Sequence, residues 1–105
     1  MSINVEALEK VLQPVETARG LPNEFYVDEA TAREESRAVF QANWTAIAYA
    51  HDVPEESDAM PLDFMGMPLL VVRDTDNHVR VFQNICRHRG MVLVNEPKKI
   101  RGVIR

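Results

Sequence analysis

The sequence predicts an α+β fold in which N-terminal helices precede an incomplete antiparallel β-sheet. Three observations support this prediction. Apolar residues recur at helical spacing near the start of the chain, two short apolar runs flank a turn further on, and the last residues have strand character. We therefore expect an N-terminal helical segment over residues 1–43 and a partial sheet domain over residues 44–105.

A short helix is expected first. Val5, Leu8 and Leu12 recur at i, i+3 and i+7, which places them on one face of a helix. Residues 20–23, Gly-Leu-Pro-Asn, then have the composition of a turn. The first helix should therefore end before this turn.

A second helix is expected after the turn, running to about Ala42. Either Asp28 or Thr31 is placed to cap its N-terminus. Thr31 and Glu34 have the spacing of a capping box, in which two side chains bond free backbone N–H groups reciprocally. The sequence does not decide between these two N-caps.

The next residues are expected to alternate between strand and loop. Residues 44–50 have the aromatic and β-branched composition of a strand, although three alanines weaken the preference. Residues 53–61 carry two prolines, a serine and several acids, which is typical of a surface loop. The final residues, 102–105, resemble the start of a further strand.

A β-hairpin is predicted over Leu69–Phe82. Residues 68–73 form a short apolar run of buried-strand length, and residues 79–83 return as its partner. Residues 74–77, Asp-Thr-Asp-Asn, supply the turn because Asp and Asn tolerate left-handed backbone.

The charge of the chain is divided unevenly. The net charge is −4, which gives no indication of nucleic-acid binding. Residues 1–63 hold four Lys/Arg and thirteen Asp/Glu, whereas residues 64–105 hold eight and three. The basic half is expected to be either the polar face of a sheet or a surface for an anion or a partner. Lys98, Lys99 and Arg101 are expected to form a solvated face, with a docking site for a protein partner as the alternative.

Cys86 is the single cysteine, so an internal disulfide is impossible. This suits a reducing compartment. No apolar run is long enough for a membrane helix, and the first ten residues lack the basic and apolar regions of a signal peptide. A cytoplasmic protein without membrane contact is therefore expected.

Residues 84–90, Asn-Ile-Cys-Arg-His-Arg-Gly, carry the chemistry of the chain. If this segment is extended, Cys86 and His88 project to the same side. A thiolate and an imidazole can serve the two irons of one [2Fe–2S] cluster whose ligands are two Cys and two His. Gly90 is expected to let the backbone turn sharply beside the cluster.

The charges around this pair agree with an electron-transfer role. Replacing two thiolates by neutral imidazoles makes the cluster less negative and therefore easier to reduce. Arg87 and Arg89 are expected to favour the reduced form further. A cysteine that packs as a small apolar residue and a catalytic Cys–His pair remain alternatives for Cys86 and His88.

The sequence resembles the α subunits of Rieske non-haem iron oxygenases, the ring-hydroxylating dioxygenases and related monooxygenases. Residues 84–90 resemble the first half of the family's cluster motif. The resemblance extends upstream over Leu21-Pro22, Phe25-Tyr26, Val39-Phe40, Trp44, residues 68–74 and residues 79–82. The hairpin turn departs from the family, since Asn77 follows Asp76 where the family usually has glycine.

The resemblance implies a Rieske [2Fe-2S] cluster with Cys86 and His88 as ligands and with Arg87, Arg89 and Gly90 supporting the cluster loop. The family's second ligand pair, a Cys-x2-His, is absent from residues 89–105. The resemblance thus implies an N-terminal fragment truncated before that pair. It assigns no role to His51 or His78.

The resemblance further implies that the full-length protein is an oxidoreductase acting with O2. A reductase or ferredoxin would supply electrons, the cluster would pass them to a mononuclear non-haem iron in the absent catalytic domain, and a small organic substrate would be hydroxylated. Such proteins are homo- or hetero-oligomers. A Rieske-type electron carrier without catalysis and a non-functional truncated remnant are the alternatives, and the fragment alone is expected to be inactive.

Overall fold

The computed structural model describes residues 4–104. The chain divides into two compact units, Met1–Thr45 and Ala46–Arg105. Each unit is described by itself. Within residues 4–104, no helix combines the length and the apolar character needed to cross a membrane.

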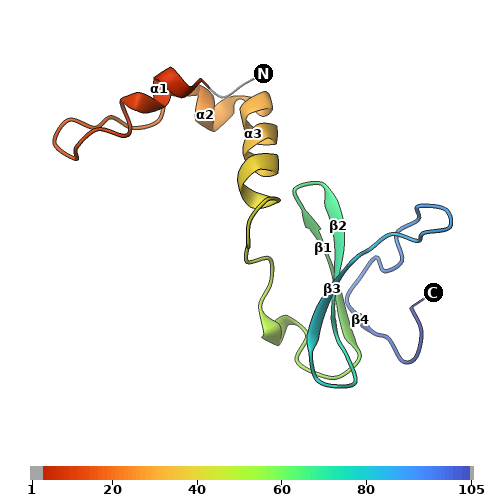
Figure 1. The fold of residues 1–105 in the computed structure, drawn as a ribbon. Helices are drawn as coiled ribbons and strands as arrows, with labels where there is room; N and C mark the ends of the chain where they lie inside the picture. Colours follow the sequence, from red (N-terminus) through yellow and green to blue (C-terminus); the bar gives the residue numbers. More distant parts are fainter. Residues whose placement is uncertain (1–3, 105) are drawn as a thin grey trace. The chain divides into compact units, whose positions relative to one another are not determined.

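The first unit is helical (Figure 1). Its elements are α1 (Val5–Glu9), α2 (Glu24–Val27), α3 (Glu29–Glu35) and the π-helical turn η1 (Ser36–Phe40). None of the four elements contains a buried residue. The two predicted helical regions are therefore present, but their apolar faces do not form a buried core within the part of the chain that the structure describes.

Asp28 is the N-cap of α3. Its carboxylate accepts hydrogen bonds from the backbone N–H of Thr31 at 2.7 Å and from the Thr31 hydroxyl at 2.8 Å. Of the two caps that the sequence allowed, Asp28 is correct and the Thr31–Glu34 capping box is wrong. Thr31 lies inside the helix, and the Glu34 carboxylate instead pairs with Arg37 at 3.0 Å.

The strand expected over residues 44–50 is wrong. Residues 45–49 have no regular structure, and the short 3₁₀ turn η2 (Ala50–Asp52) follows. Trp44 and Tyr49, with relative exposures of 104% and 72%, pack into no core. A strand needs a partner, and none of the strands in residues 4–104 pairs with this segment.

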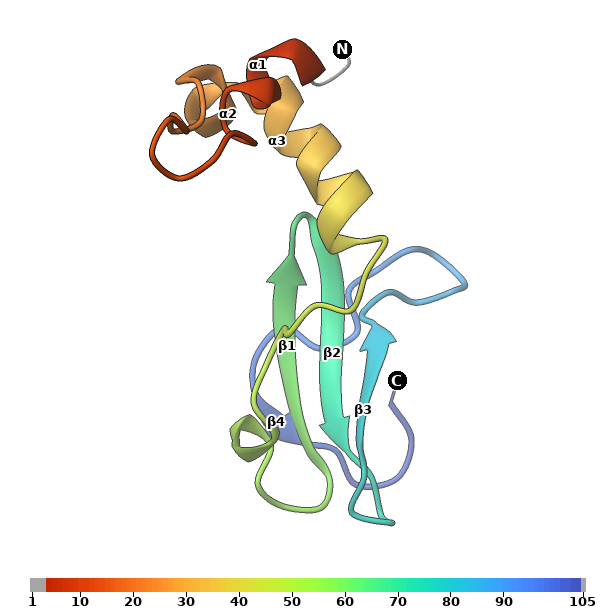
Figure 2. The same ribbon diagram turned by 60° about the vertical axis from the view of Figure 1, so that its left-hand side comes forward.

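The second unit is an antiparallel sheet with strand order β3-β2-β1-β4. Figure 2 shows β1, β2 and β3 side by side. The strands are β1 (Asp58–Phe64), β2 (Met67–Arg73), β3 (Val79–Gln83) and β4 (Lys98–Lys99). The α+β fold predicted from the sequence is confirmed.

The predicted hairpin is also confirmed. β2 and β3 pair from Leu69 opposite Gln83 to Arg73 opposite Val79. Asn77 in the connecting turn has φ +64°, the left-handed conformation that Asn tolerates. The local turn signal and the apolar runs thus fixed this register together.

β1 occupies part of the segment that was expected to be a loop. Residues 58–61 belong to the strand, with Pro61 opposite Leu70 of β2. Proline lacks an N–H and is tolerated where one side of a strand is unpaired. β4 pairs only with Asp58 and Ala59, so the outer side of β1 is free at Pro61.

The strand expected at residues 102–105 is wrong over the described residues. Gly102 has φ +90°, which is incompatible with regular strand geometry. The short strand β4 lies earlier, at Lys98–Lys99. Arg105 lies outside the described residues.

The core of the sheet unit is small. Ala59, Leu70 and Val94 form a buried cluster, and Val72, Leu93, Ile100 and Ile104 pack against it. Val71 is also buried, and successive side chains of a strand point to opposite faces. The centre of β2 is therefore covered on both sides.

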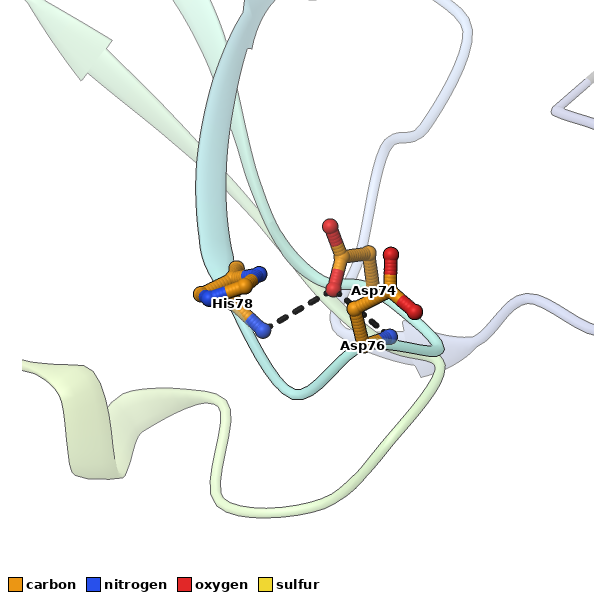
Figure 3. Close-up of side chains that lie close together, drawn as sticks. All are labelled: Asp74, Asp76 and His78. Carbon is orange, nitrogen blue, oxygen red and sulfur yellow. Dashed lines mark hydrogen bonds between the residues drawn. The ribbon is translucent and has the colours of Figure 1, made fainter.

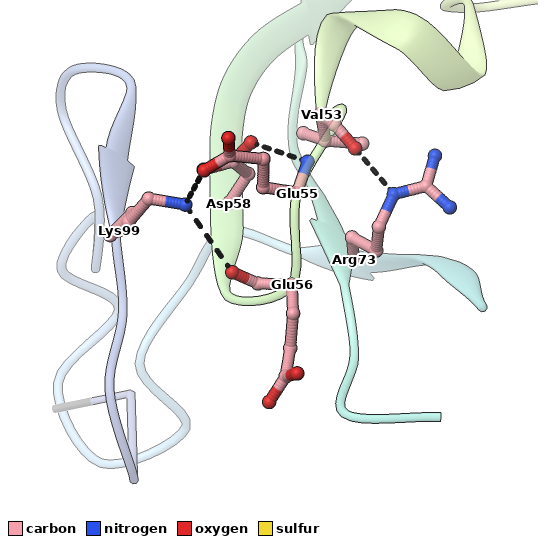
Figure 4. A network of polar contacts seen from close by, with 6 residues as sticks. All are labelled: Val53, Glu55, Glu56, Asp58, Arg73 and Lys99. Carbon is pink, nitrogen blue, oxygen red and sulfur yellow. Dashed lines mark hydrogen bonds and ion pairs between the residues drawn. The ribbon is translucent and has the colours of Figure 1, made fainter. Parts of the chain in front are cut away.

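A polar network attaches β4 and the segment before β1 to the sheet (Figure 4). The Lys99 ammonium lies 2.6 Å from the Glu55 carboxylate and 3.0 Å from the Asp58 carboxylate. Arg73 of β2 donates to the Val53 carbonyl at 2.6 Å. Lys99 therefore stabilises the edge of the sheet and is not a free charge for docking.

This network predicts a loss of stability in acid. The pKa of Asp58 lies below its ordinary value of 3.8, first because the Glu55 backbone N–H donates to its carboxylate and then because Lys99 does. A depressed pKa stabilises the fold above pH 3.8, and this contribution is lost as the pH falls through the folded-state pKa. The free energy of unfolding, measured by urea denaturation between pH 7 and pH 2, should fall less steeply in acid for Asp58→Asn than for the native chain.

The free energy of unfolding of Asp58→Asn should still decrease somewhat between pH 7 and pH 2. The pKa of Asp74 is also lowered, chiefly by the Arg80 side chain and then by the backbone N–H of His78. Asp74→Asn should therefore remove a further part of the stability loss in acid. An equal loss of unfolding free energy in acid for the native chain and for Asp58→Asn would contradict the role assigned to the network.

Candidate functional site

The candidate site is the loop that follows β3 directly. We call residues 85–93 the Cys86 loop (Figure 2). It is flanked by two buried residues, Asn84 with a relative exposure of 2% and Val94 with 1%. The loop thus leaves the sheet and returns to it through buried positions.

A single side chain joins the two ends of the loop. The Asn84 amide donates from Nδ2 to the Val94 carbonyl at 2.7 Å and accepts the Val94 backbone N–H at Oδ1 at 3.0 Å. The backbone N–H of Asn84 donates to the Pro68 carbonyl of β2 at 2.8 Å. The only sequence signal for this contact is a polar residue between an apolar strand and the cysteine, and this signal does not indicate Val94 as the partner.

The Cys86 loop is a turn and not an extended segment. The Gly90 N–H donates to the Cys86 carbonyl at 2.8 Å, and the Cys86 N–H donates to the Met91 carbonyl at 2.7 Å. The extended backbone expected to direct Cys86 and His88 to one side is therefore absent from this loop. The sharp turn expected at Gly90 is present, with φ +67°.

The side chains of the loop differ in exposure. The Cys86 thiol is free and half-buried, whereas Arg87, His88 and Arg89 are exposed. Cys86 borders a hollow of about 470 Å³. The apolar residues Leu70, Phe82, Ile85, Leu93 and Ile104 line this hollow beside Gln83 and Arg87.

This arrangement brings one soft and one borderline metal ligand onto one short turn. A thiolate and an imidazole are ligands for iron in a mixed-ligand cluster, which requires two of each. Cys86 is the only cysteine in the 105 residues, so these residues supply at most one of the two thiolates. Arg87 and Arg89 place two cations on the same turn and favour any negative charge that develops there.

A second group of polar side chains lies on the hairpin turn (Figure 3). One ligand atom each from Asp74, Asp76 and His78 lie within 4.8 Å of one another. The Asp74 carboxylate already accepts the backbone N–H groups of Asp76 and His78 at 3.0 and 2.9 Å, and it pairs with Arg80. These contacts account for the cluster as the closure of the turn.

His51 lies elsewhere in the second unit. Its ring stacks on Tyr49, with ring centroids 5.4 Å apart. It belongs to the turn η2 and is exposed.

One family model matches the chain. The model of the Rieske [2Fe-2S] domain matches residues 43–105, more than half of the sequence. These residues include the Cys86 loop and all four strands.

Curated relatives match a longer part of the chain. The alpha subunit of 2-aminobenzenesulfonate 2,3-dioxygenase from Alcaligenes sp is 31% identical over 86 residues, which cover 82% of this chain and 22% of that protein. The carnitine monooxygenase oxygenase subunit of Escherichia coli strain K12 is 30% identical over 84 residues, which cover 80% and 22%. The chain therefore spans about a fifth of the length of the curated relatives it matches.

Solved structures are also similar to the chain. A quaternary ammonium Rieske monooxygenase in complex with L-carnitine aligns with a TM-score of 0.75 at 28% identity, covering 83% of this chain and 25% of that one. Naphthalene 1,2-dioxygenase from Rhodococcus sp. bound to indole aligns with a TM-score of 0.76 at 26% identity, covering 90% and 22%.

The turn geometry predicts the effect of substitutions at Gly90. An L side chain disfavours left-handed backbone, so Gly90→Ala should lower the free energy of unfolding by about 1 kcal/mol. Gly90→Asn should lower it less, because Asn accepts this conformation more readily. Urea denaturation followed by circular dichroism measures both.

Gly20→Ala is the control for this prediction. Its backbone lies outside the left-handed region, and an added Cβ would meet nothing within 4 Å. It should leave the stability nearly unchanged. A Gly90→Ala variant as stable as the native chain would show that the loop does not hold the left-handed turn.

Proposed function

The chain belongs to the Rieske [2Fe-2S] domain family, and on this basis we propose that Cys86 and His88 each ligate one iron of a [2Fe–2S] cluster. The observation that carries the proposal is the position of both residues on one tight turn within the matched region. Cys86 supplies a thiolate to one iron and His88 an imidazole to the other. Arg87 and Arg89 support the same turn through their charge. Gly90 supports it through its left-handed backbone conformation.

The residues of the Cys86 loop fit half of such a cluster. The free thiol is half-buried beside an apolar hollow, so it is neither locked in a disulfide nor fully hydrated. The exposed imidazole is accessible as a ligand. A complete cluster also needs a second Cys and a second His. Neither is in the Cys86 loop, and the second Cys must come from outside these 105 residues.

The full-length role that we propose is electron relay in an oxygenase. When bound, the cluster takes up one electron at a time and passes it on. Electrons would come from an NAD(P)H-linked reductase, directly or through a ferredoxin, and would reach a mononuclear non-haem iron that activates O2 for hydroxylation. Support comes from the relatives, which are Rieske oxygenase α subunits.

The substrate class is a small organic molecule. The relatives' names include an aromatic sulfonate and quaternary amines, and they narrow the choice no further. We also propose a homo- or hetero-oligomeric protein, in keeping with the designation of the relatives as subunits. A single cysteine agrees with a reducing location such as the cytoplasm.

Ligand substitutions test the proposal. In the complete polypeptide that contains this sequence, Cys86→Ala and His88→Ala should each abolish the rhombic EPR signal and release most of the iron and acid-labile sulfide, because a four-ligand cluster loses one of its ligands. Iron, sulfide and EPR are measured on purified protein. His51→Ala is the matched control and should retain all three, and a native protein without iron and sulfide would refute the proposal.

The isolated 105-residue chain gives a complementary test. With one thiolate available, it should form no rhombic Rieske-type signal after reconstitution with iron and sulfide under reducing conditions. A rhombic signal with one cluster per chain would mean that the ligand assignment is wrong.

A further inference from the structure

The buried link between Asn84 and Val94 lies at the base of the Cys86 loop. Asn84 lies two residues before Cys86, and Val94 lies six residues after His88. Both are almost completely buried, with relative exposures of 2% and 1%. The segment between them carries both proposed ligands.

The Asn84 side-chain amide pairs with both backbone groups of Val94, as a neighbouring strand would. It offers one donor and one acceptor, and Val94 uses both, at 2.7 and 3.0 Å. Since these groups are buried, water cannot replace a bond that is lost, and an unpaired buried donor or acceptor is unfavourable. The link therefore resists opening more strongly than an exposed hydrogen bond would.

The link also mounts the Cys86 loop on the sheet at both ends. On one side, the Asn84 N–H bonds the Pro68 carbonyl of β2 at 2.8 Å. On the other, Val94 belongs to the buried cluster with Ala59 and Leu70. Opening the link would remove the direct connection between the two ends of the loop while the sheet pairing remained.

We propose that Asn84 is a positioning residue, which acts through the Cys86 loop to fix how Cys86 and His88 are presented to the cluster. It is not a ligand, and it contacts neither the substrate nor the reacting atoms. This inference rests on the proposed function, because it assigns Asn84 a part in that same site. A purely structural role for Asn84 is the competing explanation.

The test compares two variants in the complete polypeptide. Asn84→Asp keeps the acceptor for the Val94 N–H but replaces the donor to the Val94 carbonyl by an oxygen, whereas Asn84→Ala removes both. Asn95→Ala, an exposed asparagine next to Val94, is the matched control. The first measurement is amide hydrogen exchange in the cluster-free protein, with the buried Leu70 amide as reference for the sheet.

Exchange at Val94 should accelerate by about tenfold to a hundredfold in Asn84→Ala, by less in Asn84→Asp, which keeps the acceptor, and not in the control, while exchange at Leu70 stays unchanged. Equal acceleration at Leu70, including failure of both variants to fold, would show a general structural role and overturn the proposal. Unchanged exchange at Val94 would also overturn it.

The second measurement is made on the cluster-loaded protein. We expect a shifted EPR spectrum and reduction potential in Asn84→Ala, which adds no charge, or loss of the cluster with Leu70 protection intact. Unaltered EPR and potential would overturn the positioning role even if exchange at Val94 is faster. A native protein that holds no iron or sulfide would refute the proposed function, whereas the exchange measurement would still test the link.

Discussion

The two hydrogen bonds between the Asn84 amide and the Val94 backbone are the interaction on which the candidate site depends. The amide is a polar group in an almost dry position, where an unpaired amide is unfavourable and a fully paired amide is stable. Both of its bonds go to the backbone of Val94, and no buried polar side-chain atom in the described residues lacks a partner. The loop that carries Cys86 and His88 is therefore held by the same core that holds the sheet.

This arrangement separates a fixed base from an accessible tip. The base of the loop is buried against the sheet, whereas Arg87, His88 and Arg89 are exposed. The proposed electron-transfer role would need both properties, since the ligands must keep their geometry while a donor approaches closely. Two cations at the tip, next to the proposed imidazole ligand, also favour the uptake of an electron.

The features that sequence reasoning predicted correctly are those determined by neighbouring residues. The β2–β3 hairpin follows from two apolar runs around a turn, with Asn77 in the expected left-handed conformation. Gly90 allows the sharp turn for a similarly local reason. The cap at Asp28 was one of two local alternatives, and the structure selects it because its carboxylate reaches Thr31.

The features that were missed depend on partners far away in the sequence. Residues 58–61 form a strand despite Pro61, because β2 pairs with one side of it and β4 leaves the other side free. Residues 44–50 have strand composition but lack a partner within the described chain. The Asn84–Val94 link spans ten residues, and neither residue alone indicates it.

The ligand count explains why a fixed loop matters here. A mixed-ligand cluster needs two thiolates and two imidazoles, and this sequence contains one cysteine. In the proposed cluster, Cys86 and His88 would therefore meet a second ligand pair presented by other residues. If the Cys86 loop were free to open, each binding event would have to order it first, at a cost in conformational entropy. Because Asn84 and the Gly90 turn already restrict the loop, that entropy is lost in folding, and the proposed second pair would meet ligands that are already positioned.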